Sequence, residues 1–180
     1  MDLQVLETNR LQLDPLTASN ADLLFALFQD PDLHRYTIRD VPQSLEIFKE
    51  GCRFLEGRLS RDQTEYWLNW ISVHKNTHQI VGKIEVTLNR STLCAYLAYY
   101  TFQEHWKKGY AREACLEVIE HLFQVWSAKK IVIEMDTRNQ ASIRLAESLG
   151  AKREGHKKNA EFFKGTWSDE YCYEIVPSRS

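Results

Sequence analysis

The amino-acid sequence predicts a single α/β domain over residues 1–180, with a mixed, largely antiparallel sheet and helices on both of its faces. Two patterns lead to this prediction. Helical segments lie between strands, which implies crossover connections. The neighbouring segments Tyr66–His74 and Gln79–Leu88 form a hairpin pattern, which implies antiparallel pairing. A chain of 180 residues is also long enough to bury roughly 70% of its unfolded surface around one core.

The N-terminal part is predicted to hold one strand and two helices. Apolar and polar residues alternate over Arg10–Asp14, which indicates a strand. Asn20–Gln29 carries apolar residues at helical spacing, with Ser19 or Asn20 as the N-cap. A second helix is predicted after Pro42 by an apolar stripe made of Leu45, Phe48, Cys52, Leu55 and Leu59.

The middle of the chain changes to a β pattern and then returns to a helix. A polar turn at Lys75–His78 separates the two hairpin strands, and the aromatic-rich segment Leu93–Thr101 is predicted as a third strand. A long helix follows from about Gly109. Its apolar face recurs every three to four residues, at Ala111, Ala114, Cys115, Val118, Ile119, Leu122, Val125 and Trp126.

The C-terminal part is predicted to contain a strand, a helix and a hairpin. Lys130–Asp136 is the strand, and Asn139–Leu149 is the helix, which a glycine follows at the C′ position. The last two strands are Ala151–Phe163 and Asp169–Val176, with a turn at Lys164–Ser168 between them.

Composition excludes several classes of function. The chain has 23 basic and 25 acidic residues, and a net charge of −2 fits a nucleic-acid-binding module poorly. Its longest apolar runs fall well short of the ~20 residues that span a bilayer, and no secretion signal is recognisable, so we expect a cytoplasmic protein that does not enter membranes. The four cysteines have no metal-ligand spacing, so reduced thiols and no metal are expected.

The turn Phe102–Arg112, between a strand and a helix, carries the strongest chemical signal. The first N–H groups of a helix have no partner within the helix, and the helix dipole places partial positive charge there. Gly109 allows close approach of a ligand to the backbone, and Lys107, Lys108 and Arg112 add three cations. Lysines at a helix start oppose the dipole unless an anion is bound, so the segment favours a phosphate site, suited to a pyrophosphate. Neither of the common nucleotide-binding glycine motifs is present.

Four segments, in order along the chain, resemble the GCN5-related N-acetyltransferases (GNAT). Ala95–Ala111 is similar to the family's acyl-CoA-binding motif, and Asn139–Gly150 to its second motif, an N-x-x-S helix that ends in glycine. The tail Gly155–Asp169 and the opening Thr8–Leu11 resemble the subgroup that acetylates ribosomal-protein N-termini. Trp106 stands where relatives usually have Gln or Arg, and Lys107 where they often have Gly.

The resemblance implies acetyl-CoA as co-substrate, in a gap where the strands at 93–101 and 130–136 splay apart. Backbone groups around the end of the first strand would hold the pantetheine: Tyr99, Tyr100, Thr101 and Phe102. Backbone N–H groups of the turn would hold the pyrophosphate: Lys107, Lys108, Gly109, Tyr110, Ala111 and Arg112. Asn139 and Ser142 are the remaining expected cofactor contacts.

Direct transfer to an amine also needs a base and an acid. Glu134 stands where some relatives carry a catalytic Glu, and it is equally compatible with an exposed strand carboxylate; Glu85 is the second candidate. Ser142 stands where the ribosomal-protein subgroup has its acid, because Ala146 replaces the usual Tyr. Ser142 is equally compatible with a helix residue that only bonds the backbone, with Asn139 as N-cap.

The resulting hypothesis is an acetyl-CoA-dependent N-acetyltransferase that acts on a primary amine, of a protein N-terminus or of a small molecule, as a monomer or homodimer. The alternative is a non-catalytic acyl-CoA-binding sensor on the same fold. The acceptor wall is expected from about 32–42 and from the hairpin at 156–168, where acceptor contact and sheet packing both fit the aromatics Phe162, Phe163 and Trp167.

Overall fold

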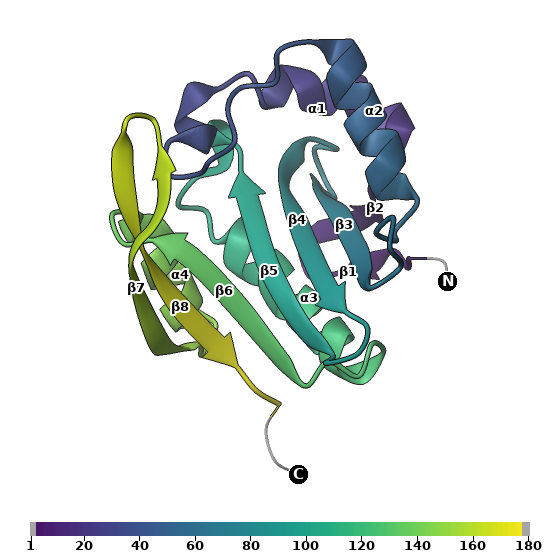
Figure 1. Ribbon diagram of the computed structural model, residues 1–180. Helices are drawn as coiled ribbons and strands as arrows, with labels where there is room; N and C mark the ends of the chain where they lie inside the picture. The colour runs from purple at the N-terminus through teal and green to yellow at the C-terminus, as the bar shows by residue number, and fades with distance from the viewer. Residues whose placement is uncertain (1–2, 178–180) are drawn as a thin grey trace.

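Eight strands form one sheet in the order β1-β2-β3-β4-β5-β6-β8-β7 in the computed structural model, which describes residues 3–177 (Figure 1). All neighbouring strands are antiparallel except β5 and β6, which are parallel. The parallel pair is bridged by a helical crossover, as such a pair requires. The mixed, largely antiparallel sheet predicted from the sequence is confirmed.

The helices and strands lie close to their predicted positions. The strands are β1 (Leu6–Glu7), β2 (Leu11–Pro15), β3 (Glu65–His74), β4 (Ile80–Asn89), β5 (Cys94–Thr101), β6 (Lys130–Asp136), β7 (Lys152–Phe163) and β8 (Thr166–Ile175). The α-helices are α1 (Ala21–Leu27), α2 (Leu45–Glu56), α3 (Tyr110–Gln124) and α4 (Gln140–Ser148). Three 3₁₀ turns complete the described part of the chain: η1 (Ala18–Asn20), η2 (Pro31–His34) and η3 (Gln103–His105).

Three local predictions differ from the structure. β1 was not predicted, because a strand of two residues is too short to show a period. The prediction of a five-residue turn at Lys164–Ser168 is wrong. Lys164 and Gly165 both have a positive φ, 49° and 77°, so two residues suffice for the turn, and β8 begins at Thr166. The second helix ends at Glu56, and Leu59 instead forms an isolated bridge with Tyr66.

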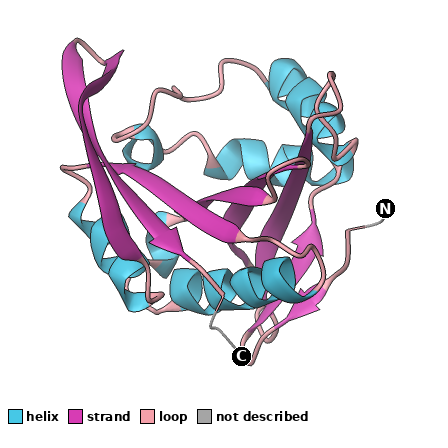
Figure 2. Cartoon of the chain, turned by 60° about the horizontal axis from the view of Figure 1, so that its bottom comes forward, coloured by secondary structure: helices cyan, strands magenta, loops and turns pink. Residues whose placement is uncertain are grey.

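Helices cover both faces of the sheet, as predicted, and each face has its own core (Figure 2). The larger core joins the sheet to α3 and α4 on what we call the α3–α4 face. The smaller core joins the opposite face, the α1–α2 face, to those two helices around Leu24, Phe28 and Cys52. Side chains alternate between the faces along each strand, so Leu68 and Trp70 lie in the larger core and Ile71 in the smaller one.

Strands β5 and β6 separate after a short paired stretch, and the site lies where they do. Their register contains only three pairs: Cys94 with Lys130, Ala95 with Ile131, and Tyr96 with Val132. Beyond these pairs the strands diverge, with the start of α3 behind the opening (Figure 1). Five residues of β5, 97–101, and four of β6, 133–136, therefore lack a partner strand on their facing edges.

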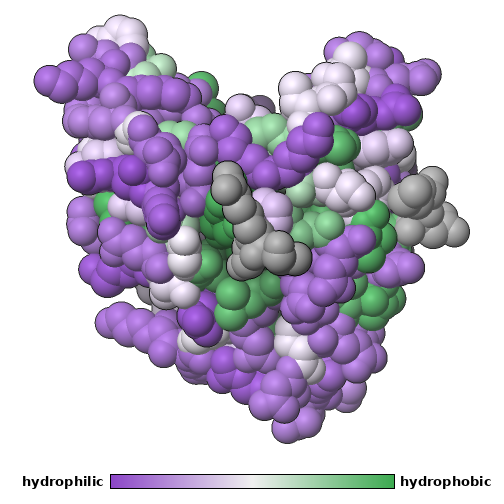
Figure 3. Space-filling model, turned by 90° about the horizontal axis from the view of Figure 1, so that it is seen from below, coloured by the Kyte–Doolittle hydropathy of each residue, from purple (hydrophilic) through white to green (hydrophobic). Residues whose placement is uncertain are grey.

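The surface of the described residues is largely hydrophilic. Seen from below, hydrophilic residues dominate the rim of the molecule, and hydrophobic residues gather near the centre of that face (Figure 3). Within residues 3–177, no helix combines the length and the apolar character needed to cross a membrane.

Gly82 on β4 is required by a close backbone contact, and this gives a test of the fold. A Cβ atom at position 82 would lie 2.3 Å from the carbonyl oxygen of Tyr100 on β5. Gly82→Ala is therefore expected to lower the free energy of unfolding by about 1–3 kcal/mol or more, measured by urea denaturation. Gly51→Ala is the control, because Gly51 lies inside α2 with no atom within 4 Å of its Cβ position. That change is expected to stabilise by up to about 1 kcal/mol, and an equal effect of both would contradict the steric explanation.

Candidate functional site

The turn between β5 and α3 presents a row of free backbone N–H groups. Lys107 and Gly109 both have positive φ, 60° and 79°, and α3 starts at Tyr110. Among the described residues, the N–H groups from Lys107 to Arg112 have no hydrogen-bond acceptor. The first amide of this helix to donate is that of Glu113, to the Gly109 carbonyl at 3.1 Å. Backbone N–H groups gathered at a helix start bind anions, so the turn is built for a phosphate group.

Cations surround this turn without neutralising partners. Lys107 and Lys108 are exposed, and no carboxylate of the described chain lies within ion-pair distance of either. Arg112 is exposed as well, and its Nε atom donates to the Ser148 carbonyl of α4 at 3.2 Å. The three predicted cations are thus placed together and remain available to an anion.

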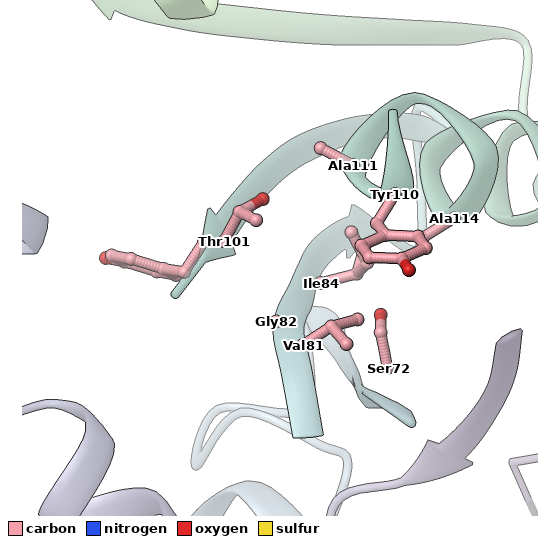
Figure 4. A pocket seen from close by; sticks show the side chains of 9 residues that line it. Ser72, Val81, Gly82, Ile84, Thr101, Tyr110, Ala111 and Ala114 are labelled. Carbon is pink, nitrogen blue, oxygen red and sulfur yellow. The ribbon is translucent and has the colours of Figure 1, made fainter. Parts of the chain in front are cut away.

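Packed side chains support the turn from behind. Tyr110 projects from the first turn of α3 toward Ser72 and Val81, and the cavity left there measures about 10 Å³ (Figure 4). That is barely enough for one water molecule. The Tyr110 ring also lies 5.5 Å from the ring of His74 and 6.1 Å from that of His105. Only the backbone of Tyr110 therefore faces the site.

The end of β5 offers fewer backbone contacts than predicted. The Phe102 N–H donates to the Val81 carbonyl of β4 at 3.1 Å, and by alternation the backbone groups of Tyr100 also point toward β4. Tyr99 and Thr101 point toward the opening instead. The prediction that all four residues present backbone groups to a ligand is therefore wrong for Tyr100 and Phe102. The Trp106 indole donates to the Thr101 carbonyl at 2.6 Å, so this side chain packs back on the strand.

The start of α4 lies against β5 through a pair of hydroxyl groups. Asn139 is the N-cap of α4, since its Oδ1 accepts from the Ser142 N–H at 3.1 Å. The Ser142 hydroxyl lies 2.7 Å from the Tyr99 hydroxyl. Burial raises the pKa of Tyr99 well above its usual value, so the phenol stays protonated. The Tyr99 side chain was missed by the sequence analysis, because nothing in the sequence indicates this contact across 43 positions.

Asp136 fixes the turn that leads from β6 into α4. Its carboxylate is 4% exposed and accepts from the Arg138 backbone N–H and the Ser168 hydroxyl, both at 2.7 Å, and from the Arg138 side chain. Its carbonyl accepts from the Asn139 N–H at 2.9 Å. Asp136 thereby positions the N-cap of α4.

The two candidate base residues lie on the α1–α2 face, opposite Ser142. Glu134 is two residues beyond the last β5–β6 pair, and its carboxylate lies 2.5 Å from Lys157 of β7. Glu85 lies 2.7 Å from Lys83 and 3.2 Å from Arg39. Burial alone would raise the pKa of Glu85, but these two cations outweigh it and lower the pKa. A carboxylate held in its charged form by two cations is a poor proton acceptor, so the geometry favours Glu134.

The two segments expected to form an acceptor wall meet at their tips. Lys164, at the tip of the β7–β8 hairpin, donates to the carbonyls of His34 and Thr37 at 2.7 Å and of Arg39 at 3.2 Å. The hairpin aromatics divide between the two roles that the sequence left open. Phe163 is buried, whereas Phe162 and Trp167 are 57% and 58% exposed and contact each other edge to face.

Divergent strands beside an amide-lined, cationic helix start define an α/β protein that holds an extended cofactor bearing phosphate. A sequence model described as an acetyltransferase (GNAT) domain matches residues 10–152. The chain belongs to the GNAT acetyltransferase family, and it is an acetyltransferase. No group of three or more potential metal ligands occurs within residues 3–177.

Known proteins are similar to this chain over nearly its full length. The uncharacterized N-acetyltransferase YoaA of Bacillus subtilis is 27% identical, over 97% of this chain and 98% of its own. The ribosomal L7/L12 alpha-N-protein acetyltransferase RimL, solved with coenzyme A, has a TM-score of 0.86 at 19% identity, covering 96% of this chain and 98% of that one. The spermidine N-acetyltransferase of Vibrio cholerae, solved with CoA and spermine, has a TM-score of 0.80 at 20% identity, covering 93% and 95%.

The Asp136 anchor predicts a pH-dependent contribution to stability. Burial alone would raise the pKa of Asp136, but the hydrogen bonds from Arg138 and Ser168 outweigh it and lower the pKa in the folded protein. Its contribution is therefore complete above the unfolded pKa of about 3.9 and is lost as the pH falls through the folded value. Asp136→Asn is expected to cost about 1–3 kcal/mol at neutral pH, and less as the pH falls below about 3, in urea denaturation.

Asp22→Asn is the control for this change. Asp22 pairs with Lys49 at 2.9 Å but is 60% exposed, so its loss is expected to change stability by less than about 1 kcal/mol at any pH. A cost for Asp136→Asn that stayed constant down to low pH would contradict the assignment.

Proposed function

We propose that residues 1–180 form one N-acetyltransferase domain, which moves an acetyl group from acetyl-CoA directly to a primary amine of a protein N-terminus or of a small molecule. The observation that carries the proposal is the row of free N–H groups from Lys107 to Arg112 at the edge of the β5–β6 opening. The row suits the diphosphate of coenzyme A, and the opening suits its extended pantetheine arm. RimL and the spermidine acetyltransferase, which share the fold, were solved with CoA.

The cofactor would run from this turn into the opening. The N–H groups of Lys107, Lys108, Gly109, Tyr110, Ala111 and Arg112 would hold the diphosphate. The free backbone groups of Tyr99 and Thr101 would pair with the pantetheine amides as a missing strand would. Asn139 and Ser142 border the other side of the opening. The thioester would then lie where β5 and β6 part.

Transfer requires one bond to form and one to break at the thioester carbon. The neutral amine attacks the carbonyl carbon, and the C–S bond breaks to release the CoA thiolate. Glu134 would take the proton that the amine loses, because it lies beside the opening with a single partner, Lys157. Ser142 would give a proton to the thiolate and regain one from Tyr99, whose hydroxyl is 2.7 Å away. Since a thiol is far more acidic than an alcohol, a weak donor suffices.

The acceptor would enter from the α1–α2 face, between the loop at 32–42 and the β7–β8 hairpin. Both segments border Glu134 and Glu85, and Lys164 ties them together. The exposed rings of Phe162 and Trp167 lie at the tip of this wall. An acetyl-transfer screen over N-terminal peptides, polyamines, aminoglycosides and amino acids identifies the acceptor, and it also separates an enzyme from a sensor that binds but never turns over.

Binding of acetyl-CoA is expected to raise the melting temperature. At about 100 times its Kd, a ligand of the native state adds about 2.7 kcal/mol of stability, which is a Tm rise of roughly 5–10 °C for a chain of this size. Differential scanning fluorimetry measures it. Adenosine, which lacks both diphosphate and thioester, is the control and should leave the Tm unchanged. No rise at millimolar acetyl-CoA would overturn the proposal.

Glu134→Gln is expected to lower kcat about 100-fold at neutral pH, with the acceptor found by the screen. The deficit should shrink at high pH, because the acceptor amine then loses its proton to solvent. Glu174→Gln is the matched control. Glu174 forms the same kind of cross-strand pair, with Lys130 at 2.7 Å, but opposite the paired part of β6. A pH–rate profile of Glu134→Gln that matched the wild type would show that Glu134 is not the base.

A further inference from the structure

Arg10 makes more contacts to the phosphate turn than any role described above requires. It lies directly before β2, in the Thr8–Leu11 segment to which no function is assigned. Its backbone N–H and its Nε atom donate to the two carboxylate oxygens of Glu113, at 2.7 and 2.6 Å. Its Nη1 atom donates to the Lys108 carbonyl at 3.0 Å, and its guanidinium lies 4.5 Å from the centre of the Tyr110 ring. One side chain thus contacts three successive parts of the turn and helix.

The bond to the Lys108 carbonyl fixes the direction of an N–H group in the site. A trans peptide is planar, and its C=O and N–H point in opposite directions. With the Lys108 carbonyl directed at Arg10, the Gly109 N–H of the same peptide must point away from Arg10, toward the open side of the turn. A Cβ at position 109 would lie 3.5 Å from the Arg10 side chain, so the two residues are in close contact.

The bonds to Glu113 remove a charge that would oppose an anion. Glu113 lies in the first turn of α3, and a carboxylate there stabilises the helix but repels a phosphate bound at the same end. It also accepts from the Thr8 hydroxyl at 2.6 Å. Burial would raise the pKa of Glu113, but the bonds from Thr8 and Arg10 outweigh it, so the pKa is lowered and the carboxylate stays charged. Arg10 supplies the balancing positive charge at contact distance.

We propose that Arg10 is a positioning residue for the diphosphate of the cofactor: it orients the Gly109 N–H toward the anion and neutralises Glu113 beneath it. The inference rests on the proposed function, since it concerns the same turn. It assigns the Thr8–Leu11 segment a role in cofactor affinity in addition to starting the sheet.

Calorimetric titration of Arg10→Gln tests this inference with three ligands. Coenzyme A and dephospho-CoA both contain the diphosphate, and each is expected to bind about tenfold more weakly than to the wild type. S-acetyl-pantetheine lacks the diphosphate, and its affinity is expected to be unchanged. A merely structural defect would weaken all three ligands alike, and that result would overturn the proposal. An unchanged affinity for coenzyme A would overturn it too.

Two further variants separate orientation from charge. Arg10→Gln/Glu113→Gln removes both charges and is expected to recover part of the lost affinity, at least about twofold over Arg10→Gln alone. No recovery would overturn the charge-balancing role. Arg10→Lys keeps the charge but loses the forked contact, and it is expected to bind coenzyme A with intermediate affinity. Should Arg10→Gln not fold, the Lys variant decides by the same comparison of ligands with and without diphosphate.

Arg90→Gln is the matched control. Arg90 also stacks on a tyrosine, at 5.0 Å from Tyr66, and donates to the Gln63 carbonyl, but it lies between β4 and β5 away from the turn. Its loss is expected to leave the affinity for coenzyme A unchanged. Failure of the wild type itself to bind coenzyme A would overturn the proposed function, which is a different result from an unchanged Arg10 variant.

Discussion

The short pairing between β5 and β6 is the constraint around which the rest of the structure is arranged. A parallel pair that continued along both strands would use the backbone groups of their facing edges. Here each strand is held by its outer neighbour instead: β5 pairs with β4 as far as Thr101, and β6 pairs with β8 as far as Asp136. The opening therefore persists without a ligand. It leaves unpaired backbone groups facing each other, and such groups need hydrogen-bond partners.

The start of α3 stands beside this opening with features that do not favour its own stability. Lysines at a helix N-terminus are unfavourable, and six successive N–H groups, 107–112, lack a partner in the described chain. Glu113 offsets this by placing a negative charge in the first turn, and Arg10 then screens that charge from the bound anion. The arrangement keeps the helix stable and the site positive, although the whole chain carries a net charge of −2.

Features that depend on local sequence were predictable, and features that depend on register or distant contacts were not. Helical spacing and Gly109 predicted α3 and its turn, and the N-cap role of Asn139 follows from its position before a helix. The pairing of Arg10 with Glu113 joins residues 103 positions apart, and no local pattern shows it. Which backbone groups of β5 face the opening depends on how β5 pairs with β4, so Tyr100 and Phe102 were assigned wrongly. The hairpin turn was misplaced because Lys164, unusually for a lysine, adopts a left-handed conformation.

The central claim is that the free N–H groups at the start of α3 bind the diphosphate of acetyl-CoA. The most direct measurement is a two-dimensional ¹H–¹⁵N NMR titration of the 21.2 kDa protein with coenzyme A. The account predicts saturable downfield proton shifts at the amides from Lys108 to Arg112, because a charged acceptor deshields the N–H that it binds. The same shifts should appear with dephospho-CoA and be absent with S-acetyl-pantetheine. Saturable binding that leaves these amides unshifted, or shifts them equally without the diphosphate, would contradict the account.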